Sequence, residues 1–247
     1  MSISLEKRAE KVGIVLAKRG LTKVPPVRVG CALDVSGSAR GFYEGSNVMQ
    51  ETIDRLMAVA MKFDDNGELD AWLFHDGVLP RLPTITESDE GTYVNKVILK
   101  QRGLWGATNY APVLKEVMDF YFGNGGSVAP VKKSMFGGLF GGKSATPAAS
   151  ATGTKQDPAM LLFITDGSNS DRSETERVLR AAEANSPVYF NMIGIGNPSY
   201  FDFIEEMADK LGNVGFTNLN DLSVSDDVLY DKIVNQEFVN WVKKYAA

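Results

Sequence analysis

Five oxygen-bearing side chains occupy polar loops of this sequence, next to apolar segments: Asp34, Ser36, Ser38, Thr108 and Asp166. The first three alternate directly after the apolar run 27–33, so in an extended turn they point to the same side. Asp166 follows the apolar run 159–165, and Thr108 lies in a glycine-rich loop before a helical pattern. Two carboxylates and three hydroxyls form an all-oxygen set, which hard divalent cations prefer. The sequence therefore predicts a metal site built from three loops.

The donor set favours magnesium over calcium. Mg²⁺ keeps near-octahedral geometry with bound water and needs few protein ligands, whereas Ca²⁺ prefers more oxygens and flexible carboxylates. Mn²⁺ can replace Mg²⁺ at such a site. Because most of the donors are neutral hydroxyls, the ion stays electrophilic toward a further anionic oxygen. We expect a Glu or Asp of a partner protein to supply that oxygen.

Strand-like and helix-like apolar patterns alternate along the chain, which predicts an α/β fold. The expected strands are 27–33, 69–75, 159–165, 188–195 and 214–216. The expected helices within the core are 49–63, 92–99, 110–122, 173–185 and 200–211. Asp76-Gly77 signals a hairpin, so 78–86 is expected to return as an antiparallel edge strand. The result is a doubly wound, Rossmann-like, mostly parallel sheet with helices on both faces, and functional groups should lie beyond the carboxyl ends of its strands.

These elements predict a single domain over residues 1–247. Its parts are an N-terminal helix, two core segments and a C-terminal helix, at 1–20, 27–122, 158–220 and 226–245. Between the two core segments, 123–157 shifts to Gly, Ser, Ala, Thr and Pro without a periodic apolar pattern. This composition is typical of a flexible insertion, because it cannot bury enough apolar surface to offset the entropy of ordering.

The composition excludes several classes of partner and places the protein in a reducing compartment. The formal net charge of −5 gives no electrostatic case for nucleic acid or for an anionic membrane. Cys31 is the only cysteine and stands in an apolar run, so the chain cannot form an internal disulfide. The first residues are charged where a secretory signal needs an apolar core, and no apolar run is long enough to span a bilayer. We therefore expect a cytoplasmic protein.

Three other patterns were weighed against the metal site. Residues 137–144 match a phosphate-binding glycine loop, but no strand precedes them and no helix follows. His75 could act as a general base on metal-bound water or on Ser36, which would make the protein a metal-dependent hydrolase of phosphoesters or peptides. Without a second base or a nucleophile elbow, the residue is more simply a turn residue bonded to its neighbours, and the hydrolase is the alternative function. Residues 64–68 have a calcium-loop composition but are interpreted as a helix cap.

Three stretches of the sequence carry a family resemblance: Leu33-Asp34-Val35-Ser36-Gly37-Ser38, Gly106-Ala107-Thr108-Asn109 and Phe163-Ile164-Thr165-Asp166-Gly167. Together they resemble the three loops of the metal-ion-dependent adhesion site of von Willebrand factor A domains, and the match covers 27–211. Within that superfamily, the N-terminal Lys-Arg-Ala-Glu-Lys helix and the stretches 29–34, 63–70 and 74–76 are most similar to the A-type domain of bacterial and phage tellurium-resistance proteins of the TerF kind.

The resemblance implies that the hydroxyls bind the ion directly and that the carboxylates bind it directly or through water. It implies an adaptor domain rather than an enzyme, active in tellurium-resistance or stress-response pathways. In related domains an anionic ligand on the metal is coupled to movement of the terminal helix, so 226–245 is expected to respond to the partner. Ala39-Arg40 departs from the pattern, because many members have a methionine there.

Overall fold

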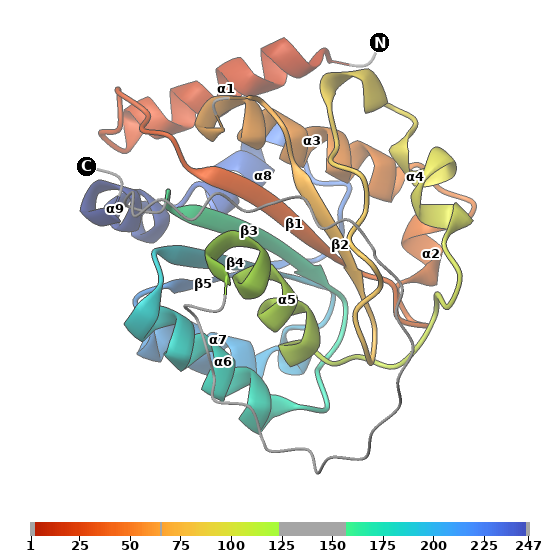
Figure 1. Cartoon of the computed structure of the whole chain (residues 1–247). Helices are drawn as coiled ribbons and strands as arrows, with labels where there is room; N and C mark the ends of the chain where they lie inside the picture. Colours follow the sequence, from red (N-terminus) through yellow and green to blue (C-terminus); the bar gives the residue numbers. More distant parts are fainter. Residues whose placement is uncertain (1–2, 65, 124–156, 246–247) are drawn as a thin grey trace, which may run out of the picture.

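A five-stranded parallel sheet forms the centre of the protein. The computed structural model describes residues 3–64, 66–123 and 157–245. The strand order is β2-β1-β3-β4-β5, and each neighbouring pair is parallel (Figure 1). The strands are β1 (Arg28–Asp34), β2 (Asp70–Phe74), β3 (Ala159–Thr165), β4 (Val188–Ile195) and β5 (Val214–Leu219). The reversal of strand order beside β1 confirms the doubly wound fold that the sequence predicts.

Helices cover both faces of this sheet (Figure 1). The α-helices are α1 (Leu5–Lys18), α2 (Arg40–Tyr43), α3 (Val48–Phe63), α4 (Tyr93–Lys96), α5 (Ala111–Phe122), α6 (Arg172–Asn185), α7 (Asp202–Lys210), α8 (Asp226–Ile233) and α9 (Gln236–Tyr245). Short 3₁₀ turns are η1 (Glu87–Asp89), η2 (Ile98–Lys100) and η4 (Pro198–Tyr200). One apolar cluster joins the sheet to α1, α3, α8 and α9, and a second joins it to α5, α6 and α7. None of the helices in the described ranges is long and apolar enough to cross a bilayer.

The central strands are apolar on both sides because both sides are covered. All seven residues of β3 and all eight residues of β4 are buried. Along β3, alternate side chains enter the two clusters, with Leu162 on the α1–α3 side and Leu161 on the α5–α7 side. Continuous apolar runs are typical of such doubly covered parallel strands, which is why their bounds agree closely with the sequence prediction.

The antiparallel edge strand predicted at 78–86 is not a strand in the described structure. The segment runs beside β2, with isolated antiparallel bridges at Val78 and Ile85. Between these bridges, the Leu79 and Leu82 N–H groups donate to carbonyls of β2 at 3.0 and 3.1 Å. Pro80 and Pro83 have no N–H group to donate, so a continuous hydrogen-bond ladder cannot form along this edge. The described sheet is therefore entirely parallel, with this segment as an irregular cover on β2.

The single helix predicted at 226–245 is wrong, because the chain breaks into α8 and α9. The side-chain amide of Asn191 on β4 donates to the Ile233 carbonyl at 2.6 Å, at the end of α8. The Asn235 side chain then accepts a hydrogen bond from the Phe238 N–H at 2.8 Å, as an N-cap of the next helix does. The predicted coupling of a metal-bound ligand to the terminal segment stays a prediction, and it concerns two helices rather than one.

The helix predicted at 92–99 is also interrupted. It forms a short α4 and the 3₁₀ turn η2, with Val97 between them. Val97 and Ile98 are β-branched, which lowers their preference for helix. The segment predicted as a flexible insertion, 123–157, lies outside the described residues except at its two ends, and so does the glycine loop 137–144.

A buried ion-pair cluster joins three helices on one face of the sheet. Asp226, in the first turn of α8, lies 3.0 Å from Arg55 Nε on α3 and 3.5 Å from Arg8 Nε on α1. All three residues are less than one-tenth exposed. A buried carboxylate between two guanidinium groups is held mainly by those charges, since water cannot solvate it there.

We predict that Asp226→Ala lowers the free energy of unfolding by about 3–5 kcal/mol, because it leaves two buried guanidinium groups without their carboxylate. The matched control is Asp227→Ala, which removes the neighbouring carboxylate; that side chain is 76% exposed and pairs with Lys11. The control should change stability by less than about 1 kcal/mol. Urea denaturation of both variants gives the comparison, and equal effects would contradict the role assigned to the buried cluster.

Candidate metal centre

The candidate ligands lie at the carboxyl edge of the two central strands. Asp34 is the last residue of β1, and Asp166 follows directly after β3. The strands β1 and β3 are neighbours in the sheet, so the loops that leave them are adjacent. This is the edge at which open parallel sheets collect their functional groups.

A chain of hydrogen bonds joins four of the five predicted site residues. Asp34 Oδ1 accepts from the Ser36 backbone N–H at 2.8 Å. The hydroxyls of Ser36 and Ser38 lie 3.2 Å apart, and the Ser38 hydroxyl donates to Asp166 Oδ1 at 2.9 Å. The alternation of Asp34, Ser36 and Ser38 therefore does turn these side chains toward the loop after β3, as the sequence predicts.

Thr108 reaches the same place through its backbone. Its loop pairs with the β1 loop, where the Gly37 N–H donates to the Gly106 carbonyl at 2.9 Å. The Thr108 carbonyl accepts from the Ser170 N–H at 3.0 Å, which ties it to the loop after β3. Among the described residues, the hydroxyl of Thr108 takes no part in the hydrogen-bond chain of the other four. The structure thus brings the Thr108 loop to the site without joining its hydroxyl to the other ligands.

The residues that hold Asp34 were not predicted from the sequence. Its carboxylate accepts from the Thr165 hydroxyl at 2.6 Å, and its carbonyl accepts from the Tyr43 hydroxyl at 2.7 Å. The Tyr110 hydroxyl lies 3.2 Å from Thr165 Oγ1 and also donates to the Gly167 carbonyl. Thr165 lies inside the sequence motif that contains Asp166, so the sequence pointed to it. The two tyrosines lie outside the motif and contact residues elsewhere in the sequence, so no local pattern indicated them.

A second missed residue, Asp171, joins two of the three loops. It precedes α6, yet its carboxylate accepts from the first backbone N–H groups of α5, Tyr110 at 3.0 Å and Ala111 at 2.8 Å. Asn169 and Thr175 donate to the same carboxylate at 2.7 and 3.1 Å. A carboxylate at a helix N-terminus is favoured by the free N–H groups and the helix dipole. Asp171 thereby sets the position of the Thr108 loop relative to the Asp166 loop.

The electrostatics of the site favour a bound cation. Asp34 is 2% exposed and Asp166 is half-buried. Burial raises the pKa of both carboxyls above the usual range, against the lowering effect of their hydrogen bonds to serine and threonine hydroxyls. In the part of the chain that the structure describes, no Lys or Arg forms an ion pair with either one. A divalent ion would supply the missing positive charge.

The chemistry of the donors fits Mg²⁺ or Mn²⁺ better than a softer metal. The hydrogen-bonded cluster offers only carboxylate and hydroxyl oxygens, which are hard donors. Within the described ranges, no three His, Cys, Asp or Glu side chains gather into a possible metal cluster. A site here must therefore use its hydroxyls.

Two minor predictions for other loops are confirmed. His75 Nδ1 lies within hydrogen-bond distance of the Asp76 carboxylate and 3.2 Å from the Gly77 N–H, as expected of a turn residue bonded to its neighbours. Asp64 caps the end of α3, where its side chain accepts from the Asn66 N–H at 3.2 Å. The segment 64–68 is a helix cap, with Asp65 outside the described residues.

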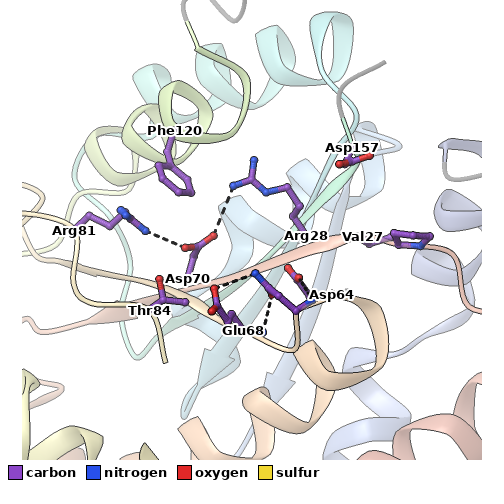
Figure 2. Close-up of a pocket in the computed structure, with 11 residues that line it drawn as sticks. Val27, Arg28, Asp64, Glu68, Asp70, Arg81, Thr84, Phe120 and Asp157 are labelled. Atoms are coloured by element: carbon purple, nitrogen blue, oxygen red, sulfur yellow. Dashed lines mark hydrogen bonds and ion pairs between the residues drawn. The ribbon is translucent and has the colours of Figure 1, made fainter. Parts of the chain in front are cut away.

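A separate cavity of about 390 Å³ lies at the opposite end of the strands. Figure 2 shows Asp70 between Arg28 and Arg81, which approach it to 4.0 and 2.9 Å. The Arg81 guanidinium also lies 4.2 Å from the centre of the Phe120 ring. These charges compensate one another, so the cavity is explained as a structural ion-pair cluster.

Comparison with known proteins places the chain in a family. The vWA-TerF-like family model, a von Willebrand factor A domain found in the TerF C terminus, matches residues 26–131 and 145–247. The chain belongs to the TerF-like von Willebrand factor A family. It is 33% identical over 250 residues to uncharacterized protein YcbR of Bacillus subtilis (strain 168), a match that covers 98% of this chain and 87% of that protein. Membership of this family indicates a role in protein interaction or adhesion.

Solved structures share the von Willebrand factor A fold at low sequence identity. Proximal thread matrix protein 1 of the mussel byssus matches with a TM-score of 0.52 and 16% identity, over 86% of this chain and 49% of that chain. A von Willebrand factor type A protein of Catenulispora acidiphila matches with a TM-score of 0.53 and 13% identity, over 87% and 43%. The chain spans less than half the length of these solved chains, so the likeness concerns the fold alone.

We predict that Asp171→Ala lowers the free energy of unfolding by roughly 2–3 kcal/mol, because the N–H groups that start α5 lose a charged acceptor. The control is Asp202→Ala, an exposed aspartate in the first turn of α7, where about 0.5 kcal/mol is expected from the helix dipole. Hydrogen exchange should show faster exchange at Tyr110 and Ala111 in the first variant only. Unchanged protection of these two amides would contradict the assignment.

Proposed function

We propose that this von Willebrand factor A domain holds one Mg²⁺ or Mn²⁺ and uses it to bind an acidic residue of a partner protein. The direct ligands are the hydroxyls of Ser36, Ser38 and Thr108. Asp34 and Asp166 bind directly or through water. The observation that carries the proposal is the hydrogen-bonded cluster beyond two neighbouring strands. In it, buried Asp34 accepts from the Ser36 backbone N–H, and the Ser36 and Ser38 hydroxyls lead on to Asp166.

The same donor set supports a partner carboxylate as the remaining ligand. Because three of the five proposed ligands are neutral hydroxyls, the ion stays electrophilic, and an open coordination position can accept another anionic oxygen. Gly37 and Ser38 are exposed, so this side of the site faces solvent. A Glu or Asp on a partner surface can reach it, which makes the bound ion the centre of an intermolecular contact.

The hydrolase alternative has no specific support in this geometry. A general base needs to reach the reacting group, whereas the His75 contacts that the structure describes at Nδ1 go to Asp76 and Gly77, and no described hydrogen bond joins the ring to Ser36. The family relationship to TerF supports a role in tellurium-resistance or stress-response pathways. The single buried cysteine fits a reducing compartment, which supports a cytoplasmic location.

The metal is tested by calorimetric titration of Mg²⁺ into the wild type and into Asp34→Ala. The wild type should bind one ion per chain, and at a free concentration of 100 times Kd this should raise the free energy of unfolding by about 2.7 kcal/mol. Asp34→Ala should remain folded and show neither heat of binding nor stabilisation. The matched control is Ser168→Ala, an exposed residue of the same loop as Asp166, which should bind as the wild type does.

The partner is tested with the same three proteins. Wild type and Ser168→Ala, used as bait with Mg²⁺, should retain a shared partner that EDTA releases, and Asp34→Ala should not retain it. Unchanged Mg²⁺ affinity in folded Asp34→Ala would refute the metal assignment. Metal-independent retention of the partner by all three would refute the proposed mode of binding.

A further inference from the structure

A tryptophan in an unusual backbone conformation borders the candidate metal site. Trp105 has φ +74°, the left-handed region, and no other non-glycine residue in the described ranges has a positive φ. This conformation is unfavourable by roughly 1–3 kcal/mol for a bulky residue and persists only where its surroundings enforce it. Such strain is concentrated at binding and switch sites, so the surroundings of Trp105 are informative.

Contacts on both sides enforce the turn. The Trp105 N–H donates to the Val35 carbonyl at 2.7 Å. At the next residue, Gly106, a Cβ atom would lie 2.7 Å from the Asp76 carboxylate and 2.8 Å from His75 Nδ1, so only glycine fits. The turn is thus held between the β1 loop and the loop after β2. It places the Trp105 carbonyl against Gly37, where an added Cβ would lie 3.8 Å away.

The ring of Trp105 supports an exposed arginine. Its centroid lies 5.7 Å from that of Tyr43, in an edge-on arrangement, and 5.7 Å from the guanidinium carbon of Arg40. The Nε of Arg40 bonds Glu44 at 2.7 Å. Its Nη1 and Nη2 groups form no hydrogen bond or ion pair with described residues, and the side chain is 57% exposed. Stacking and the Glu44 contact orient the guanidinium and leave its outer edge for a ligand.

The arginine and tryptophan flank the proposed ligands from two loops. Arg40 follows Ser38 by two residues at the start of α2, and Trp105 precedes Thr108 by three residues. Their contact therefore joins the β1 loop to the Thr108 loop, and the same two loops pair through the bridge between Ser36 and Gly106. We call Arg40 and Trp105 the rim pair. A carboxylate is a preferred anionic ligand of a guanidinium group, because the two can form two parallel hydrogen bonds.

We propose that Arg40 determines the specificity of this site by binding a second carboxylate, so that the preferred partner is an acidic segment with two carboxylate side chains. One carboxylate completes the metal shell and the other bonds the outer edge of Arg40. This inference rests on the proposed metal-dependent function. The inference adds to that function one further residue, a second contact and a requirement on the partner's sequence.

The test compares two synthetic peptides on Mg²⁺-loaded protein by NMR chemical-shift titration. The peptides are acetyl-Gly-Gly-Glu-Gly-Gly-amide and acetyl-Gly-Glu-Gly-Glu-Gly-amide. The wild type should bind the peptide with two glutamates about fivefold to tenfold more tightly, in keeping with one partly exposed charge-assisted contact. Arg40→Ala should remove this preference, Arg40→Lys should keep part of it, and Trp105→Ala should weaken it because the guanidinium loses its support.

The matched control is Arg180→Ala, which removes an arginine from a similar exposed pair with Glu176 on α6. It should keep the full peptide preference, and equal losses in both arginine variants would reduce the effect to general charge. Calorimetry should show the same Mg²⁺ affinity in Arg40→Ala as in the wild type. If the protein binds Mg²⁺ but responds equally to the two peptides, or responds to neither, the proposed role of Arg40 is overturned. A protein that binds no Mg²⁺ overturns the proposed function itself.

Discussion

The buried carboxylate of Asp34, at the end of the central strand β1, is the constraint around which this end of the molecule is built. A carboxylate that is 2% exposed is unfavourable as an anion unless hydrogen bonds or a cation compensate it. Thr165 and the Ser36 backbone supply two hydrogen bonds, from β3 and from the β1 loop. Burial still raises the pKa of Asp34, so these bonds do not compensate the charge in full. A bound divalent ion would compensate the rest of the negative charge.

Binding an ion at this site requires the three ligand-bearing loops to keep fixed positions relative to one another. A separate contact joins each pair of loops. Ser38 and Asp166 join the loops after β1 and β3. The carboxylate of Asp171 joins the loop after β3 to the start of α5. Trp105 joins the third loop to β1 through Val35. The site is therefore held mostly by groups that are not ligands, and the strained turn at Trp105 is one consequence of holding it.

Sequence reasoning recovered most of this arrangement, for physical reasons that can be named. Doubly covered strands such as β3 are continuous apolar runs, so their ends are visible in the sequence. Asp34 and Asp166 follow directly where those runs stop. The break between α8 and α9 was missed because the groups that enforce it include Asn191, 42 residues away on β4. Asp171 was missed for the same reason, since it caps a helix 60 residues earlier in the chain.

The edge of the sheet shows a different limit. A hairpin signal at Asp76-Gly77 correctly indicates that the chain turns back beside β2, but Pro80 and Pro83 interrupt the ladder, so isolated bridges and single hydrogen bonds take its place. The hydroxyl of Thr108 is another feature whose surroundings the sequence predicted only in part. Its loop arrives at the site as expected, while the structure joins it there through backbone groups. Local sequence patterns thus predict the positions of the elements and of the candidate ligands in the sequence. Contacts between residues far apart in the sequence determine their arrangement in space.

Water-proton relaxation with Mn²⁺ is the sharpest test of the proposed metal site, because it reports both the bound ion and its open coordination position. We expect strong enhancement for one Mn²⁺ per chain and a decrease when a carboxylate ligand displaces bound water. A folded Ser36→Ala/Ser38→Ala variant should lose the enhancement. Relaxation equal to that of free Mn²⁺, or an enhancement that the double variant retains, would contradict the proposed metal site.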